Sequence, residues 1–150
     1  MERLVLFVCT GNVCRSPMAE YLLRTRLDGS SGWCVTSAGV VAGAGMSASA
    51  PAVHVMQEIG IDMTSHRSRS LTVELVDSAT LIVVMTMAHR DQIRVFFPNA
   101  LQKVFLLKSF SGSNGDIDDP IGSSVSCYRA VRNEIDNAMP DLIGFMKELE

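Results

Sequence analysis

The feature that most constrains the fold is a short polar loop near the start of the chain, enclosed between two apolar patterns. Residues 4–8 form a continuous apolar run that predicts a buried strand, and residues 18–27 have the apolar spacing of an amphipathic helix. Pro17 suits the first turn of that helix, where its missing N–H costs no hydrogen bond. Strand, loop and helix therefore follow one another without a gap, and the loop must lie at the helix N-terminus.

The loop itself, residues 9–16, has the composition of a reactive anion site. Unpaired backbone N–H groups and the positive end of the helix dipole favour an anion at this position. Arg15 adds a planar guanidinium that matches two phosphate oxygens. In such a positive field we expect the Cys9 thiol to ionise at neutral pH and to attack phosphorus. The pattern therefore predicts phosphoryl transfer through a cysteine.

The same loop carries a resemblance to a known family. The spacing from Cys9 to Arg15 and Ser16 fits the C-x5-R-[ST] signature of cysteine-dependent phosphatases. Residues 9–20 (CTGNVCRSPMAE) resemble the low-molecular-weight protein tyrosine phosphatase family, whose bacterial branch also includes protein arginine phosphatases. The resemblance extends from residue 4 to about residue 148. It implies that residues 1–150 form one phosphatase domain, which works through a cysteinyl-phosphate intermediate and needs no cofactor or metal.

The family resemblance assigns roles within residues 9–16, the phosphate loop. It implies that Cys9 is the nucleophile and that phosphate is bound by the residues after it: Thr10, Gly11, Asn12, Val13, Cys14, Arg15 and Ser16. Ser16 is expected to donate its hydroxyl to the Cys9 sulfur. Asn12 is expected to adopt a left-handed backbone conformation, which asparagine tolerates. His66 is expected to support Asn12 from behind, as a structural rather than a catalytic residue.

A carboxylic acid is needed to protonate the leaving group and then to activate water against the phosphoenzyme. An acidic loop after the last predicted strand offers Asp116, Asp118 and Asp119. The general acid of the family directly precedes a proline, and in this chain Asp119 precedes Pro120. We therefore assign the acid role to Asp119 and interpret the other two aspartates as an ordinary acidic turn.

The rest of the chain alternates predicted strands with predicted helices, which favours a parallel α/β sheet with helices on both faces. Further strands are predicted at residues 33–38, 81–85 and 104–107. Further helices are predicted at residues 51–60, 72–77, 88–97 and 125–149. Pro140 is expected to kink the last helix or to start a second helical segment, and residues 40–49 to form a mobile loop beside the site. The family resemblance implies a single domain with four strands in the order 2-1-3-4.

Composition excludes several kinds of partner. There are 13 basic and 16 acidic residues, the net charge is −3 and no basic run is present, so nucleic acid is not an expected partner. No apolar stretch approaches the roughly eighteen residues of a membrane span, and no signal peptide is visible. We expect a cytoplasmic monomer that acts on phosphorylated proteins.

The four cysteines do not form a zinc pattern with the histidines. Cys9 and Cys14 share one loop, so oxidation could pair them and protect the nucleophile reversibly. Cys14 could equally be a small residue that packs under the loop, and the sequence favours neither interpretation. We expect Cys34 and Cys127 to be buried small hydrophobic residues.

Substrate specificity depends on two positions that give opposite indications. Tyrosine-directed relatives, particularly eukaryotic ones, have aromatic residues after the Asp-Pro pair, whereas this chain has Ile121, as arginine-directed bacterial relatives do in that loop. At the position of Val13, however, arginine-directed relatives have a threonine, whose hydroxyl can orient water toward a phosphoramidate. Val13 thus favours phosphotyrosine as the substrate, with phosphoarginine as the alternative.

Two other functional classes have less support. A thioredoxin-coupled arsenate reductase uses a similar loop but needs two further cysteines close together, and Cys34 and Cys127 lie far apart in the sequence. A phosphate-binding module without activity needs no thiol, so the combination of Cys9, Arg15 and Asp119 argues against it. A nucleotide-binding P-loop is excluded because no Gly-Lys-Ser/Thr follows the loop.

Overall fold

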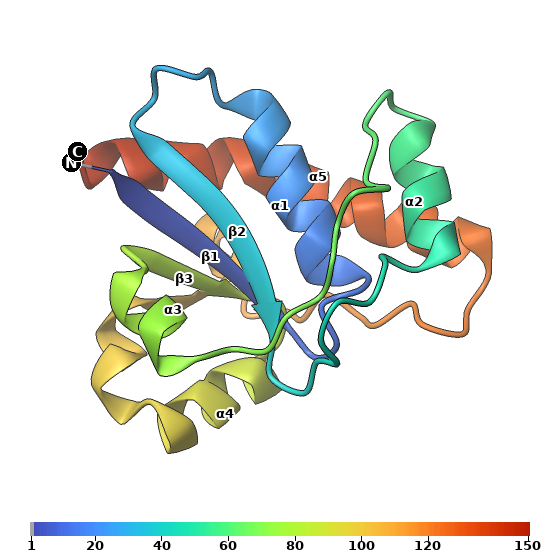
Figure 1. Ribbon diagram of the computed structural model, residues 1–150. Helices are drawn as coiled ribbons and strands as arrows, with labels where there is room; N and C mark the ends of the chain where they lie inside the picture. The colour runs from blue at the N-terminus through green and yellow to red at the C-terminus, as the bar shows by residue number, and fades with distance from the viewer. Residues whose placement is uncertain (1) are drawn as a thin grey trace.

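The computed structural model describes residues 2–150 and has a sheet of four parallel strands at its centre (Figure 1). The strand order is β2-β1-β3-β4. The strands are β1 (Arg3–Cys9), β2 (Trp33–Gly39), β3 (Leu81–Val84) and β4 (Val104–Leu106). All adjacent strands pair in parallel, and the register sets Cys9 opposite Gly39. The predicted fold class and strand order are confirmed.

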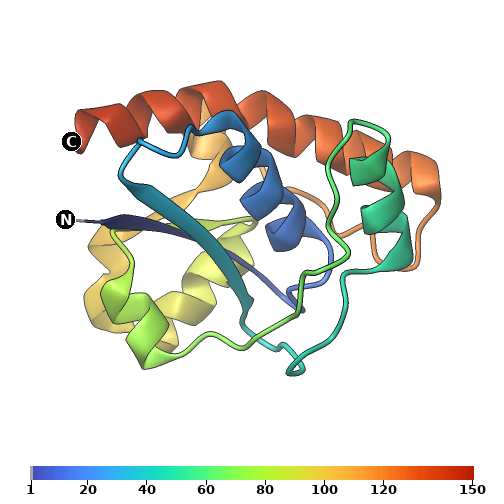
Figure 2. The same ribbon diagram turned by 45° about the horizontal axis from the view of Figure 1, so that its top comes forward.

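Helices cover both faces of this sheet (Figures 1 and 2). The α-helices are α1 (Arg15–Arg26), α2 (Ala50–Gln57), α3 (Val73–Ser78), α4 (Met87–Phe96) and α5 (Val125–Glu148). The short 3-10 helices η1 (Pro98–Lys103) and η2 (Leu107–Ser111) flank β4. α1 and α5 lie on one face and α3 and α4 on the other, while α2 packs beside α5. Among residues 2–150, no helix combines the length and apolar character needed to cross a bilayer.

Successive side chains of β1 point to opposite faces of the sheet, and a hydrophobic core lies on each face. Phe7 packs among buried residues of α1 and α5, including Met18. Its neighbours Leu6 and Val8 point to the opposite face, where they pack with residues of α3 and α4. A central strand that is buried on both faces reads as a continuous apolar run, and its last residue, Cys9, reaches the carboxyl edge of the sheet.

Two details of the helices differ from the sequence prediction. α1 begins at Arg15, three residues earlier than predicted, because the buried sides of Arg15 and Ser16 face the phosphate loop and add nothing to the apolar pattern. α5 is continuous from Val125 to Glu148, so the expectation that a second segment starts at Pro140 is wrong. Pro140 is exposed, and there solvent can satisfy the carbonyl that its missing N–H leaves unpaired.

The prediction that Cys34 and Cys127 are buried is also wrong, since both are exposed. Cys34 lies on the edge strand β2 between the buried Trp33 and Val35, so strand alternation turns it to the opposite side. Cys127 lies in the first turn of α5, on its exposed side.

The two ends of the described chain lie together at the edge of the sheet opposite the phosphate loop (Figure 1). Trp33, at the start of β2, donates its indole N–H to Glu150 Oε2 over 3.2 Å. Arg3, which begins β1, pairs with Trp33 in the sheet. The amino edge of the sheet thus holds both ends of the chain, and the carboxyl edge holds the candidate site.

Candidate active site

The phosphate loop joins the end of β1 to the start of α1. Cys14 is the N-cap of α1 and Arg15 is its first residue, so the loop lies at the positive end of the helix dipole. Residues 40–49, predicted to lie beside the site, do flank the loop. The backbone N–H groups of Val40 and Val41 donate to the carbonyls of Cys9 and Thr10 at 3.0 and 2.9 Å.

The thiol of Cys9 is 2 % exposed, and its Sγ lies 2.9 Å from Ser16 Oγ. Ser16 Oγ also accepts a hydrogen bond from Asn12 Nδ2 at 2.9 Å. Because the amide supplies the hydrogen of that bond, the hydroxyl hydrogen of Ser16 is left to point at the sulfur. Such a donor stabilises a thiolate more than a thiol, so the arrangement suits a cysteine nucleophile.

Asn12 holds the loop in shape. Its φ of 57° is the only positive value at a non-glycine residue within residues 2–150, and such a conformation costs about 1–2 kcal/mol. His66 Nε2 donates to the Asn12 carbonyl at 2.8 Å, from the side that the sequence analysis expected. The Asn12 side chain accepts from the N–H of Arg69 at 3.0 Å and donates to Ser37 Oγ at 2.9 Å. Three residues from two separate segments therefore fix one strained residue.

Sequence reasoning missed the support that Ser37, Glu20 and Arg69 give to this residue. Ser37 passes the hydrogen bond on to Glu20 Oε1 at 2.5 Å, and the buried Glu20 also pairs with Arg24. Ser37 belongs to β2 and Arg69 to the segment before α3, so only the tertiary fold brings them to the loop. The one signal in the sequence is Glu20, an acidic residue at a buried position of a predicted helix, where a charged side chain needs a partner.

Arg15 connects the phosphate loop to the acidic loop after η2. Its side chain is 5 % exposed, and its Nη1 donates to the Ile117 carbonyl at 2.8 Å. Its Nη2 lies 3.4 Å from Thr10 Oγ1 and 3.5 Å from Asp119 Oδ2. The structure thus brings together the residues that the sequence analysis assigned as catalytic, Cys9, Arg15 and Asp119.

Asp116 and Asp119 of the acidic loop lie in different surroundings. Asp116 Oδ1 accepts the N–H of Met87 at 2.9 Å and so tethers the start of α4. Asp119 Oδ1 accepts the N–H of Ile121 at 3.1 Å across Pro120, and its side chain is 42 % exposed. The carboxylate of Asp119 therefore stands at the mouth of the site, in contact with Arg15.

Cys14 lies beneath the loop and is tied to α5. Its Sγ lies 3.3 Å from Ser49 Oγ and 3.4 Å from the hydroxyl of Tyr128, a buried residue of α5. Burial raises the pKa of the Cys14 thiol above its ordinary value, although the two hydroxyls oppose the effect. Burial also raises the pKa of Tyr128, to about 12. Both groups are thus neutral at physiological pH.

The two positions assigned to specificity differ in exposure. Val13 is half-buried and packs on the core from within the phosphate loop. Ile121 is 59 % exposed in the acidic loop, just beyond Asp119. The structure therefore sets Val13 in the binding loop and Ile121 on the surface beside it.

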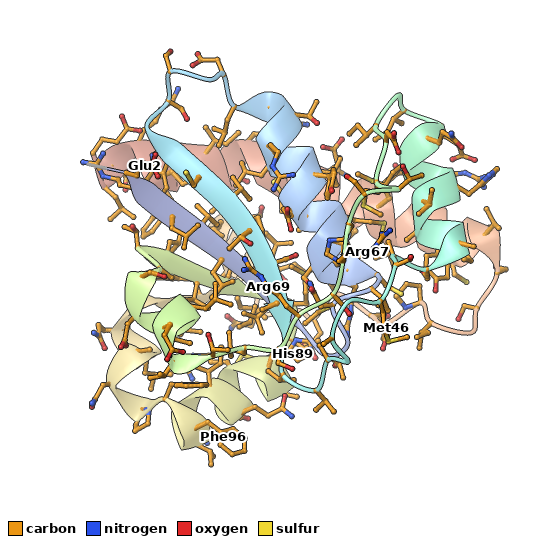
Figure 3. The ribbon with its side chains drawn as sticks, in the orientation of Figure 1. Glu2, Met46, Arg67, Arg69, His89 and Phe96 are labelled. Atoms are coloured by element: carbon orange, nitrogen blue, oxygen red, sulfur yellow. The ribbon has the colours of Figure 1, made fainter. Side chains whose placement is uncertain are left out.

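His89 is a buried residue near the site that the sequence analysis did not select. It lies in the first turn of α4, is 2 % exposed, and has Nε2 2.9 Å from Thr10 Oγ1 (Figure 3). No motif marks it, because a histidine on the buried side of a helix is usually part of the core. Its relation to the phosphate loop is evident only in three dimensions.

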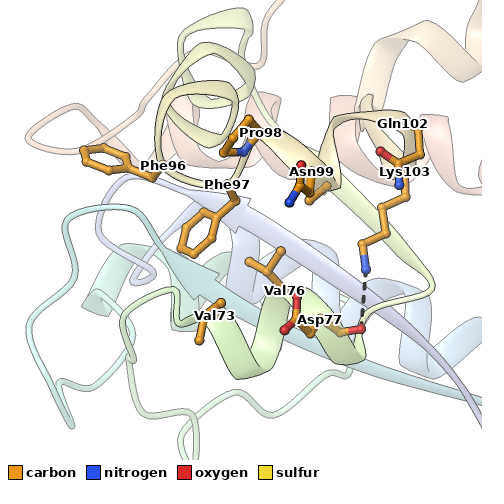
Figure 4. A pocket seen from close by; sticks show the side chains of 10 residues that line it. Val73, Val76, Asp77, Phe96, Phe97, Pro98, Asn99, Gln102 and Lys103 are labelled. Atoms are coloured by element: carbon orange, nitrogen blue, oxygen red, sulfur yellow. Dashed lines mark hydrogen bonds between the residues drawn. The ribbon is translucent and has the colours of Figure 1, made fainter.

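The other features bear little on this chemistry. Within residues 2–150, no group of three or more His, Cys, Asp or Glu side chains is arranged to hold a metal. A pocket of about 230 Å³ lies between α3 and the α4–η1 segment (Figure 4). Its lining mixes apolar side chains with polar and charged ones, and Lys103 at one end donates to the carbonyls of Asp77 and Ala79. No phosphate-loop residue lines this pocket.

The sequence is similar to known phosphatases over nearly its whole length. A family model described as low molecular weight phosphotyrosine protein phosphatase matches residues 4–150. The chain is 47% identical over 140 residues to a protein-arginine-phosphatase of Geobacillus stearothermophilus, with 92% of each chain covered. It is 45% identical over 128 residues to EpsP of Ralstonia solanacearum, a probable low molecular weight protein-tyrosine-phosphatase, with 85% of each chain covered.

The fold is shared with solved structures as well. A YwlE arginine phosphatase variant with a phosphorylated active-site serine superposes with a TM-score of 0.91 and 38% identity, over 96% of this chain and 95% of that chain. The family model, the relatives and the shared fold all agree with the loop built around Cys9 and Arg15. The chain therefore belongs to the low molecular weight protein-tyrosine-phosphatase family of hydrolases.

Proposed function

We propose that this protein hydrolyses phosphotyrosine in phosphorylated proteins of the cytoplasm, through a cysteinyl-phosphate intermediate. The observation that carries the proposal is the convergence of Cys9, Arg15 and Asp119 on one anion site at the N-terminus of α1. The phosphorylated active-site serine of the similar YwlE variant supports a covalent phosphoenzyme. A reducing compartment would keep the nucleophilic thiol available.

In the first step the Cys9 thiolate attacks phosphorus, and an Sγ–P bond forms as the bond from phosphorus to the tyrosine oxygen breaks. Arg15 binds two non-bridging oxygens and balances the charge of the transition state. Asp119, as the carboxylic acid, gives its proton to the leaving oxygen. The exposed Asp119 stands above the buried Arg15, so proton donor and phosphate ligand approach the substrate at different depths.

In the second step water hydrolyses the cysteinyl-phosphate. The Asp119 carboxylate accepts a proton from the water, whose oxygen bonds to phosphorus while the Sγ–P bond breaks. The sulfur leaves as a thiolate, and the Ser16 hydroxyl at 2.9 Å stabilises the charge that returns to it. Inorganic phosphate is then released from the loop.

The choice of phosphotyrosine rests on Val13. The valine side chain has no hydroxyl to orient water toward a phosphoramidate, and an aliphatic residue at this loop position resembles the tyrosine-directed branch of the family. Phosphoarginine is the second candidate, because the chain is 47% identical to a protein-arginine-phosphatase and has Ile121 rather than an aromatic residue after the Asp-Pro pair.

Turnover of a phosphotyrosine peptide and of a phosphoarginine peptide, measured side by side, tests the proposal. Cys9→Ser serves as the blank, and Val13→Thr asks whether the loop position decides specificity. Val95→Thr, the same substitution at an exposed position of α4, is the matched control. We expect the wild type to prefer phosphotyrosine, Val13→Thr to move the ratio toward phosphoarginine, and the control to leave it unchanged.

A wild type that prefers phosphoarginine would mean that the loop around Ile121 outweighs Val13. Absence of turnover on both peptides would contradict the phosphatase assignment and favour arsenate reduction or phosphate binding alone. The arsenate alternative is then decided by thioredoxin-dependent reduction of arsenate.

A further inference from the structure

The imidazole ring of His89 has one hydrogen-bonding partner among residues 2–150, and that partner is part of the phosphate loop. Its Nε2 lies 2.9 Å from Thr10 Oγ1, whereas its buried Nδ1 makes no hydrogen bond with these residues. Thr10 directly follows the nucleophile and is the loop's only threonine. The ring is therefore oriented by its contact with the loop, in addition to its packing against the core.

Thr10 Oγ1 also lies between His89 and the phosphate-binding arginine. Arg15 Nη2 is 3.4 Å from the same oxygen. A guanidinium can only donate hydrogen bonds, so the Thr10 oxygen accepts from Arg15. The hydroxyl hydrogen of Thr10 is then free to point at Nε2, provided that this nitrogen is unprotonated.

The surroundings of His89 favour that neutral form. Burial and the nearby Arg15 cation lower the pKa of the imidazole to about 4, against weaker opposing effects of the Asp116 and Asp119 carboxylates. The ring also lies in the first turn of α4, where the helix dipole disfavours a cation. With Nε2 unprotonated, the single hydrogen of the neutral ring resides on Nδ1.

We propose that His89 is a positioning residue for phosphate binding: it accepts the Thr10 hydroxyl hydrogen at Nε2 and so keeps the Thr10 oxygen turned toward Arg15. The guanidinium is then held on three sides, by Thr10, by the Ile117 carbonyl and by Asp119. Because Arg15 must present its fork to two phosphate oxygens, loss of one support weakens anion binding without removing any group that touches the anion. The inference refines the proposed function, since it concerns how the same site holds its substrate.

The dissociation constant of inorganic phosphate, measured by calorimetry, tests the role without any phosphopeptide. His89→Phe fills a similar volume but has no acceptor, and we expect phosphate to bind about tenfold more weakly. His89→Gln can set an amide oxygen near the place of Nε2, so its constant should lie within about threefold of the wild type. Thr10→Val should match His89→Phe, and the double variant should be no weaker than either single variant.

Three results would overturn the proposal. Unchanged phosphate binding by His89→Phe would show that the ring only fills space. Effects of His89→Phe and Thr10→Val that multiply in the double variant would show that the two residues act independently. Nitrogen-15 NMR of the wild type should show the Nδ1–H tautomer of His89, and an Nε2–H tautomer would reverse the hydrogen bond.

His89→Asn provides the decision if the phenylalanine variant does not fold, because its shorter amide cannot reach Thr10. We then expect Asn to bind phosphate about tenfold more weakly than Gln, and equal constants would contradict the proposal. Failure of the proposed function can be told apart from failure of this inference. A wild type that binds phosphate but turns over neither phosphopeptide would contradict the proposed function, whereas the phosphate dissociation constants of the variants would still test the role of His89.

Discussion

Asp119 is close enough to Arg15 to interact with it in the free enzyme, and the proposed mechanism also makes it the proton donor. Asp119→Asn keeps the shape of the side chain but removes both the acid and a negative charge near the guanidinium. We expect kcat on phosphotyrosine peptide to fall by about 10²–10⁴, while inorganic phosphate binds as tightly as before or more tightly. Steady-state kinetics and calorimetry measure the two effects.

Asp118→Asn is the matched control, since Asp118 is an exposed neighbour in the same loop. It should retain nearly full turnover. Normal turnover by Asp119→Asn together with a large loss in Asp118→Asn would transfer the acid role to Asp118.

The buried imidazole of His89 should make the fold sensitive to acid. Its pKa in the folded protein is about 4, below the usual value of about 6.5, so between these two values the unfolded chain binds more protons than the folded one. The free energy of unfolding should therefore fall as the pH drops from about 6.5 to about 4, by up to about 3 kcal/mol from this residue.

Urea unfolding of the wild type and of His89→Gln between pH 4 and 7 measures this contribution. The stability of the wild type should decline more steeply with acidification than that of the variant. Parallel curves would mean that His89 takes up its proton as readily in the folded state as in the unfolded one.

At the scale of the structural elements, the end of β2 packs tightly against the phosphate loop. A Cβ atom built on Gly39 would lie 2.5 Å from the Thr10 carbonyl oxygen and 3.0 Å from the Asn12 nitrogen. Both are backbone atoms of the loop, so a side chain at Gly39 can be accommodated only if the loop moves. A glycine is required here by space rather than by backbone conformation.

Gly39→Ala should therefore damage the site more than the fold. We expect kcat/KM on phosphotyrosine peptide to fall by about a hundredfold or more, because small displacements of reacting groups cost that much. Gly144→Ala in α5 is the control, since a Cβ there meets nothing within 4 Å. It should leave kinetics unchanged and stabilise the helix by about 0.5–1 kcal/mol. Equal kinetics for the two variants would show that the loop adapts to the added methyl group.

The elements themselves were largely predictable from the sequence, but their ends were not. The apolar runs of β1 and β3 are continuous because both faces of the central strands are buried, and that pattern is visible in the sequence. The start of α1 could not be read from the sequence, because Arg15 and Ser16 are polar residues that are buried through their contacts with the phosphate loop. At Pro140 the sequence suggested a helix boundary that is absent. A proline is a local signal for such a boundary, and it does not reveal that α5 continues past it.

At the scale of the whole molecule, the site is assembled from most of the fold. The phosphate loop is held by Ser37 of β2, by His66 and Arg69 of the segment before α3, and by Tyr128 of α5 through Cys14. Cys9, Arg15 and Asp119 follow a recognisable motif, so the sequence was enough to propose them as nucleophile, phosphate ligand and acid. These supports lie 25 to 114 residues away from the loop residues that they contact, and only His66 among them was expected from the family resemblance.

Because so many segments meet at the loop, an anion bound there should stabilise the entire fold. Phosphate at a hundred times its dissociation constant should add about 2.7 kcal/mol to the free energy of unfolding, which corresponds to a rise of roughly 5–10 °C in Tm for a domain of this size. Thermal melts with and without phosphate measure the change.

Arg15→Ala is the control for this experiment, because phosphate also stabilises proteins without binding to a site. The variant should lose nearly all of the shift. A shift of the same size in Arg15→Ala would place the stabilising anion elsewhere than in the phosphate loop.

The position of the chain ends has a practical consequence for handling the enzyme. Both lie at the amino edge of the sheet, where Trp33 contacts Glu150, while the phosphate loop lies at the other edge. A tag at either end can thus anchor the molecule to a bead or sensor surface with its reactive side facing outward. Phosphoproteins too bulky to reach a randomly attached enzyme would still have free access to Cys9.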